Sequence, residues 1–485
     1  MDMPLKQFSL NYGLGSLPEE YGGFHNQKYG LLNLETCEKL TTHEPILFSF
    51  MIDVSGSMSD TVRGFRTKIQ LLIMTLQNMV HYFTQYDHIY MEIYGFDSKI
   101  HQYVEYTHVT TSNANMIIEK IQSIRPMSST NIGLALTTLN SNMNIIREEV
   151  SDDYKIGILL TDGEPTCGIH NIEELAAILL STHIYHFIAL GERHNSRLMN
   201  ALGKSHSLCC DWFIDDIELT GNVYGEILFN EMNRILNHVT IEVEGGSIYN
   251  YKTGCFEPCL EIGHLSCESK KEFHILSENM SNIVIRCCGK LLNNELFTLT
   301  SIVNKPIIDQ PIDNLKQYYR LCVQKLMYDI RMTLKMDNVS IYDRLYAHQP
   351  CFTFALPSHN LNIDFVKSAE LLKEHIESFI KQQHLEHDEL MSGLMTDLSL
   401  IMKIKSHIVD PFTYLNAREN TQGRQLAFDS GTQILDDDND EYLGQLLPPV
   451  LERSRTTAYT SPGRTMLMRE ISSNRANNTF TVPYP

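Results

Sequence analysis

Between Pro45 and about Leu236, short apolar runs alternate with stretches whose apolar residues recur at helical spacing. The run Ile46–Ile52 (ILFSFMI) is continuous and of strand length, which is typical of a strand buried on both faces. The same pattern predicts further strands at Ile89–Tyr94, Ile156–Leu160 and Ile184–Leu190, and helices that include Ile69–Val80, Ile172–Leu180 and Ile217–Leu236. This alternation predicts an α/β domain with a doubly wound, mostly parallel, Rossmann-like sheet and helices on both faces.

The pattern changes from His238 to about Val303, where short runs such as HVTIEV and NIVIRC are separated by Gly, Asn and Ser. Such spacing is typical of an antiparallel β-sandwich. The stretch Tyr29–Leu40 also has a strand pattern, and we expect it to pair with this later domain. The predicted order is an N-terminal segment (1–44) that contributes a strand to the sandwich, the α/β domain (45–236) as an insertion, and the β-sandwich domain (237–303).

Beyond the sandwich, the two prolines of Asn304–Asn314 indicate a linker. Apolar residues then recur at helical spacing in three segments, which predicts a helical region over residues 304–410; the segments are Leu315–Leu334, Ala369–Ile380 and Leu390–Ile404. The acidic run Asp436–Glu441 and the Ser-, Thr-, Asn- and Arg-rich stretch Thr456–Pro485 favour disorder. We therefore expect residues 411–485 to be a largely disordered tail.

Composition and net charge exclude several classes of protein. A hydrophobic fraction of 43% in 485 residues is enough for two or three domains with real cores. The formal net charge of −20 argues against a nucleic-acid binder and against docking on an anionic membrane, and it suits a protein that attracts divalent metal. No run reaches the ~18–20 apolar residues of a spanning helix. We expect no signal peptide in Met1–Gly30, and we read the 11 cysteines as reduced thiols of a cytoplasmic protein.

A group of oxygen-bearing side chains directly follows the first buried strand. Asp53, Ser55 and Ser57 alternate on a short loop, and Gly56 allows the backbone to turn sharply between them. Loops at the carboxyl ends of strands form the ligand-binding crevice of a doubly wound sheet. Two further segments add oxygens at strand-to-helix transitions: Thr130 precedes a short apolar helix, and Asp162 follows the strand IGILL. Mg²⁺ prefers such oxygen ligands and usually keeps some water.

The motifs DVSGSM, TNIGLAL and LLTDGEPT, in this order and spacing, resemble the metal-ion-dependent adhesion site (MIDAS) of von Willebrand factor A (vWA) domains. The resemblance covers about Pro45–Leu236. It implies that Ser55, Ser57 and Thr130 contact a divalent cation directly, and that Asp53 and Asp162 do so directly or through water. The cation is Mg²⁺, or Mn²⁺ or Ca²⁺. One departure is Ser128-Ser129, where many vWA domains have two glycines.

The overall layout is also similar to the vWA and β-domain part of plant wavy-growth-type RING ubiquitin ligases. Those proteins carry a RING zinc finger before the vWA domain, whereas this chain has no Cys-x-x-Cys pair. Ubiquitin-ligase activity is therefore not carried over.

The resemblance implies a metal-dependent protein-binding module or scaffold, in which the cation bridges to an Asp or Glu of a protein partner. We expect no enzyme, because the sequence has no phosphate-binding loop, nucleophile elbow or HExxH helix. The alternatives are a metal-dependent enzyme, a component of a ubiquitin-transfer assembly, and a structural protein of a virion or the cytoskeleton.

Several other residues have a functional and a plainer interpretation. Cysteines and a histidine in one short segment could bind zinc, but their spacing fits no standard finger, and burial in the sandwich explains them better; they are Cys255, Cys259, His264 and Cys267. The vicinal pairs Cys209-Cys210 and Cys287-Cys288, together with Cys167, are interpreted as packing or neutral residues. Asp97 could line the metal crevice, although an exposed turn residue is more frequent. We interpret as ordinary core or surface residues His81, His88, His183 and His186.

Overall fold

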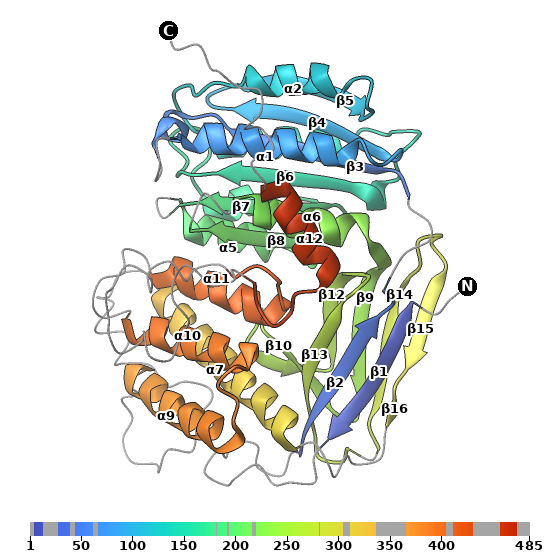
Figure 1. The fold of residues 1–485 in the computed structure, drawn as a ribbon, viewed down its shortest axis with the longest axis vertical. Coiled ribbons are helices and arrows are strands. Elements are labelled where there is room, and N and C mark those ends of the chain that lie inside the picture. The colour runs from blue at the N-terminus through green and yellow to red at the C-terminus, as the bar shows by residue number, and fades with distance from the viewer. Residues whose placement is uncertain are drawn as a thin grey trace. The chain divides into compact units, whose positions relative to one another are not determined.

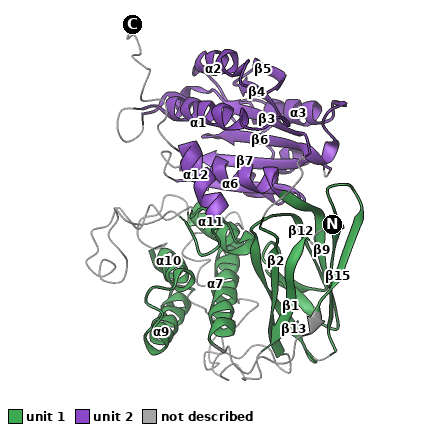
Figure 2. Ribbon diagram, turned by 45° about the vertical axis from the view of Figure 1, so that its right-hand side comes forward, with its two compact units in different colours: residues 1–39, 234–461 green, residues 40–233, 462–485 purple. Residues whose placement is uncertain are grey.

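The computed structural model describes residues 4–12, 28–38, 44–61, 66–180, 182–191, 194–215, 220–280, 282–303, 311–335, 365–403, 411–429 and 456–472. The chain divides into two compact units, which Figure 2 shows in different colours. The α/β unit comprises residues 40–233 and 462–485, and the sandwich unit comprises residues 1–39 and 234–461. Both units are therefore built from separate parts of the chain.

The α/β unit is organised around a six-stranded sheet with the order β5-β4-β3-β6-β7-β8 (Figure 1). Its strands are β3 (Ile46–Asp53), β4 (Ile89–Phe96), β5 (Ile100–His108), β6 (Lys155–Thr161), β7 (Ile184–Leu190) and β8 (Cys209–Ile214). All neighbours pair in parallel except β4 and β5. Every residue of β3, β6 and β7 is buried, which is why these strands read as continuous apolar runs. The predicted doubly wound sheet is confirmed.

Helices connect these strands and cover the sheet. They are α1 (Lys68–Phe83), α2 (Ala114–Gln122), α3 (Ile132–Met143), α4 (Ile172–Ala176), α5 (Ser196–Gly203) and α6 (Thr220–Met232), with short 3₁₀ turns η2 (Gly56–Ser59) and η3 (Asp152–Tyr154). Polar caps fix several starts: Thr67 and Gln70 form a capping box on α1, and the Asn131 side chain accepts a hydrogen bond from the Leu134 amide at the start of α3. The helix predicted over Ile217–Leu236 is shorter, because Arg234 already belongs to the next strand.

A helix from the far end of the chain completes the α/β unit. Helix α12 (Pro462–Ser472) packs against α6 and α1, and Leu467, Met468 and Ile471 are buried. The expectation of disorder is wrong for this segment. Its sequence is short and polar, and its burial depends on a tertiary contact: a Cβ on Gly225 of α6 would lie 2.6 Å from the Met468 Cα, so the two backbones touch there.

The sandwich unit contains two mainly antiparallel sheets, with the strand orders β11-β10-β13-β2-β1-β16 and β12-β9-β14-β15. The early strands are β1 (Leu5–Tyr12) and β2 (Lys28–Thr36), and those after the α/β unit are β9 (Arg234–Glu244), β10 (Ser247–Asn250), β11 (Cys255–Glu257), β12 (Cys259–Ser266), β13 (Lys270–Ser277), β14 (Val284–Lys290), β15 (Leu296–Thr300) and β16 (Ile302–Val303). β2 pairs with β13 over eight residues: Lys28 lies opposite Ser277 at one end of the pairing, and Glu35 lies opposite Lys270 at the other. The α/β unit is therefore inserted between β2 and β9.

Helices follow the sandwich and share a core with it: α7 (Pro311–Lys335), α9 (Phe365–Gln383), α10 (Glu389–Lys403) and α11 (Pro411–Arg424). Their presence confirms the predicted helical region. The expectation of disorder from residue 411 is wrong for α11, which is largely buried although most of its residues are polar. Ion pairs explain that burial, since Arg331 of α7 binds Glu419 and Arg418 binds Asp397 of α10. The acidic run Asp436–Glu441 lies outside the described residues.

Within the described part of the chain, no helix is both long and apolar enough to cross a membrane.

Candidate metal centre

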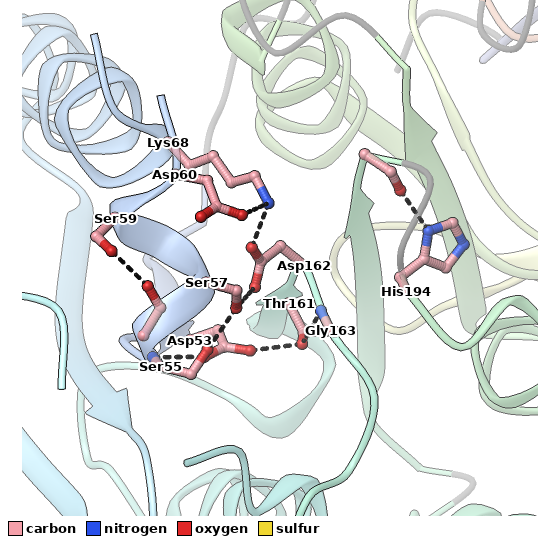
Figure 3. A network of polar contacts seen from close by, with 12 residues as sticks. Asp53, Ser55, Ser57, Ser59, Asp60, Lys68, Thr161, Asp162, Gly163 and His194 are labelled. Atoms are coloured by element: carbon pink, nitrogen blue, oxygen red, sulfur yellow. Dashed lines mark hydrogen bonds and ion pairs between the residues drawn. The ribbon is translucent and has the colours of Figure 1, made fainter. Parts of the chain in front are cut away.

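The candidate centre begins with Asp53, the last residue of the central strand β3. Its side chain is completely buried, and both carboxylate oxygens accept hydrogen bonds: Oδ1 from the Ser55 backbone N–H at 2.8 Å and Oδ2 from the Thr161 hydroxyl at 2.6 Å (Figure 3). Burial raises the pKa of Asp53 to about 6, although the hydrogen bonds from Ser55 and Thr161 oppose this shift. Among the described residues, no cationic side chain pairs with Asp53.

Hydroxyl groups connect Asp53 with the second carboxylate. The Ser55 and Ser57 hydroxyl oxygens lie 3.0 Å apart, and the Ser57 hydroxyl donates to Asp162 Oδ1 at 2.7 Å (Figure 3). Asp162 follows β6 directly and is 1% exposed. The loop after β3 and the loop after β6 therefore bring four of the predicted residues together at the carboxyl ends of adjacent parallel strands.

Thr130 reaches the same place from the loop before α3. A Cβ built on Gly163 would lie 3.9 Å from both the Ser57 Oγ and the Thr130 Oγ1, so both hydroxyls lie beside this glycine. The loop is fastened on both sides: the Thr130 N–H donates to the Thr166 hydroxyl at 2.8 Å, and the Gly56 N–H donates to the Ser128 carbonyl at 3.3 Å. The fold thus gathers the oxygens of all five sequence-predicted residues.

Two residues of the centre were missed by the sequence analysis. Thr161 positions Asp53, as described above. Lys68, the first residue of α1, donates from Nζ to Asp162 Oδ2 at 2.6 Å, and its side chain is only 11% exposed. The N-terminus of a helix carries a partial positive charge, so a lysine there is unfavourable by itself. Lys68 at this position was therefore a signal of a compensating contact with an acidic group.

Asp97 lies outside this group of oxygens but supports it. Its Oδ1 accepts hydrogen bonds from the Lys99 backbone N–H at 2.8 Å and from His101 Nε2 at 3.0 Å. Its carbonyl accepts from the Asn131 N–H at 2.9 Å, next to Thr130. Partial burial raises the pKa of Asp97, but these hydrogen bonds outweigh it and keep the pKa below its usual value.

Among the other candidates, Cys255 and Cys259 are exposed, so their expected burial in the sandwich is wrong, whereas two histidines have local structural contacts. His186 lies between the Glu231 carboxylate, 3.1 Å from its Nε2, and the Trp212 indole, which donates to its Nδ1 at 3.0 Å. His183 lies 3.2 Å from the Asn144 side-chain oxygen. In the described part of the chain, no three His, Cys, Asp or Glu side chains are grouped as a metal site. The centre around Asp53 differs in kind, because it combines two carboxylates with hydroxyls.

Comparison with known proteins identifies the domain. Residues 49–224 match the family model of the von Willebrand factor type A domain. The α/β unit therefore contains a VWA domain. Domains of this class generally mediate protein–protein interactions, and some of them do so with a metal at the MIDAS.

A comparison with curated proteins gave no match. Among solved structures, the chain is similar to the ArnB paralog VWA2 from Sulfolobus acidocaldarius, with 14% identity, 87% of this chain and 98% of that chain covered, and a TM-score of 0.46. It is also similar to a von Willebrand factor type A protein from Catenulispora acidiphila, with 11% identity, 96% of each chain covered and a TM-score of 0.48. A third structure is the mussel byssus proximal thread matrix protein 1 with a zinc-occupied MIDAS motif, with 18% identity, 38% and 45% coverage, and a TM-score of 0.31.

The chemistry of the donor set fits a divalent cation. A buried carboxylate is costly unless a positive charge or several hydrogen bonds accompany it. Asp53 has only neutral hydrogen-bond donors, and hydroxyl and carboxylate oxygens are the ligands that hard cations prefer. The residues that converge here can therefore hold Mg²⁺, Mn²⁺ or Ca²⁺.

Proposed function

We propose that this protein is a metal-dependent protein-binding module. In this proposal Asp53, Ser55, Ser57, Thr130 and Asp162 hold one divalent cation, Mg²⁺ or alternatively Mn²⁺ or Ca²⁺. The observation that carries the proposal is the buried Asp53 carboxylate, which faces neutral donors in a group of oxygens from three separate loops.

A bound cation would supply the positive charge that attracts a carboxylate of a partner protein. Two protein carboxylates only just neutralise a divalent ion, and the neutral hydroxyls add no charge. An incoming Asp or Glu side chain can therefore gain a strong, charge-assisted contact. The protein's own part is to hold the oxygens in place: the hydrogen bonds from Ser55 and Thr161 orient Asp53, and the Thr166 hydroxyl fixes the Thr130 loop.

Binding suits these residues better than catalysis does. Metal-assisted hydrolysis needs a group that can take a proton from the attacking water. In the proposed metal-bound protein Asp53 and Asp162 would both be ligands of the cation, so neither carboxylate would be available as that base. We therefore place the protein among binding proteins rather than enzymes.

The first test measures metal binding to the full chain. Calorimetric titration with Mn²⁺ and Mg²⁺ should show one site, and Asp53→Asn should weaken its affinity by at least about tenfold, because a buried charge contact is lost. Asp87→Asn is the matched control, since the Asp87 side chain is fully exposed, and it should bind metal like the wild type. A wild-type chain that binds neither ion would exclude the proposal.

The second test asks whether the metal carries the partner contact. The chain is immobilised in Mg²⁺, loaded with cell extract and eluted with chelator, and the eluted proteins are identified by mass spectrometry. A true partner should elute with chelator, bind the Asp87→Asn control and fail to bind Asp53→Asn. Partners that stay bound in chelator would remove the cation from the mechanism.

A further inference from the structure

Lys68 holds the Asp162 carboxylate with a charge of its own. Its Nζ lies 2.6 Å from Asp162 Oδ2, while Ser57 donates to the other oxygen, Oδ1. The Asp162 side chain is 0% exposed and the Lys68 side chain 11% exposed, so the ammonium group reaches a nearly dry carboxylate from the rim of the site (Figure 3). The pair therefore has little solvent screening.

We infer that Lys68 is a built-in competitor of the metal: its ammonium satisfies Asp162 in the metal-free protein and must leave that carboxylate when a divalent cation binds. This inference rests on the proposed metal site. Lys68 and a divalent cation would share the one Asp162 carboxylate, and two positive charges at this distance in a nearly dry site repel each other strongly.

Asp60 provides the place to which the ammonium moves. Its Oδ2 already lies 3.8 Å from Lys68 Nζ, and its side chain is 51% exposed. The backbone around Lys68 need not move, because the Lys68 N–H donates to the Asp60 carbonyl at 3.1 Å and the Thr67 cap fixes the start of α1. A rotation within the lysine side chain is sufficient to exchange Asp162 for Asp60.

This exchange explains why a lysine stands at the first position of α1. The contact with Asp162 offsets the unfavourable position at the positive end of the helix dipole. It also keeps the site folded without metal, at the expense of metal affinity. Occupancy of the site then depends on the concentration of free divalent cation rather than being permanent.

The main experiment compares Mn²⁺ affinity in the wild-type chain and in Lys68→Met, which keeps the length of the side chain without its charge. Lys68→Met should bind Mn²⁺ about tenfold more tightly or better, because a nearby positive charge is removed. Its metal-free thermal midpoint should be lower than that of the wild type, because Asp162 then lacks a cation, and its metal-induced rise in midpoint should be larger. Lys68→Gln repeats the test if the methionine variant folds poorly.

Lys120→Met is the matched control, since it removes the same charge from α2, and it should leave Mn²⁺ affinity unchanged. A double-mutant cycle then separates exchange from simple repulsion. Asp60→Asn should weaken Mn²⁺ binding in the wild-type background, where Lys68 needs a new partner. The same change should have little effect in the Lys68→Met background.

The outcomes distinguish this inference from the proposed function. If both Lys68→Met and the wild type bind Mn²⁺ with equal affinity, the competition is wrong and the metal site stands. If Asp60→Asn weakens binding equally in both backgrounds, Asp60 acts only through its charge and the exchange is wrong. If no variant binds Mn²⁺ or Mg²⁺, the proposed function fails and this inference with it.

Discussion

Two buried carboxylates of the sandwich unit have other partners than the two buried carboxylates of the candidate metal centre. In the sandwich unit, Glu419 receives two hydrogen bonds from the Arg331 guanidinium, at 2.5 and 3.0 Å, and Asp397 receives one from Arg418 and one from Gln422. In the candidate metal centre, Asp53 accepts hydrogen bonds from neutral amide and hydroxyl donors, and Asp162 contacts a hydroxyl and a lysine.

The difference separates a structural role from a binding role. An arginine fork occupies a carboxylate in a fixed planar geometry and leaves little room for another ligand. Hydroxyls and a flexible lysine leave the carboxylate able to accept a cation. Buried acidic residues of similar exposure can therefore be sorted by what donates to them, and the predictions below test that division.

The largest effect is expected for Glu419→Gln. It leaves the Arg331 guanidinium, 2% exposed, without its buried counter-charge, and breaking such a pair typically costs about 3–5 kcal/mol. Denaturant titration of the full chain should show this loss in the free energy of unfolding, while Mn²⁺ affinity stays at the wild-type value. Glu386→Gln, at an exposed position, is the control. A loss below about 1 kcal/mol would show that the pair contributes little to stability.

Metal removal should have a smaller effect, confined to the α/β unit. At a free Mg²⁺ concentration of 100 times the dissociation constant, binding to the folded state stabilises it by about 2.7 kcal/mol. Chelator should abolish that gain in a thermal scan. Asp162→Asn should lose the metal-dependent part, whereas Glu419→Gln should keep it. Equal responses of the two variants to Mg²⁺ would contradict the division between structural and binding carboxylates.

Two short helices show where sequence reasoning stops. The long amphipathic helices and the apolar strands were predictable, because their apolar residues recur at the spacing of the element. Helix α11 has few apolar residues, and its burial depends on Arg331 and Asp397, which are distant in the sequence. Helix α12 depends on glycines of α6 that lie more than 200 residues earlier. The pattern of apolar residues within each helix predicts neither of these contacts.

The residues of the candidate site also fall into those that the sequence predicted and those that it missed. Asp53, Ser55 and Ser57 are recognisable from their alternation on one loop, and Thr130 and Asp162 only from the resemblance to a known arrangement of three motifs. Thr161 and Lys68 act through hydrogen bonds to Asp53 and Asp162 across the fold. A hydroxyl next to an aspartate and a lysine at the start of a helix are too common to single out in advance.

Gly225→Ala tests the contact that holds α12. The added Cβ would lie 2.6 Å from the Met468 Cα and 2.9 Å from its amide nitrogen, so the helices must separate. Overpacking of this kind typically costs about 1–3 kcal/mol, which exceeds the gain in helix propensity from alanine. The free energy of unfolding of the α/β unit should therefore fall by about 1–3 kcal/mol.

Gly393→Ala is the matched control for the glycine variant. Gly393 lies within α10, where the nearest atom to the new Cβ, Gln422 Nε2, is 3.8 Å away, an ordinary contact. This variant should be neutral or slightly more stable. If Gly225→Ala behaved in the same way, α12 would not be held by close backbone contact.

The smallest effect concerns His274, a buried base that pairs with no acidic side chain among the described residues. Its Nδ1 lies at hydrogen-bond distance, 2.8 Å, from the Tyr29 hydroxyl, and burial together with the nearby Arg320 holds its pKa well below the usual 6.5. The unfolded chain therefore binds a proton below pH 6.5 that the folded chain does not. This contribution to stability is fully present above pH 6.5, and it is lost as the pH falls, by about 1 kcal/mol between pH 6.5 and 5.5. The variant His274→Gln can still form a hydrogen bond with Tyr29, and it should lose this part of the pH dependence in denaturant unfolding at several pH values. His387→Gln, at an exposed position, should keep it. If the free energy of unfolding of His274→Gln changed with pH as it does in the wild type, an acidic side chain would have to pair with protonated His274, as arginines pair with Glu419 and Asp397 in the same unit.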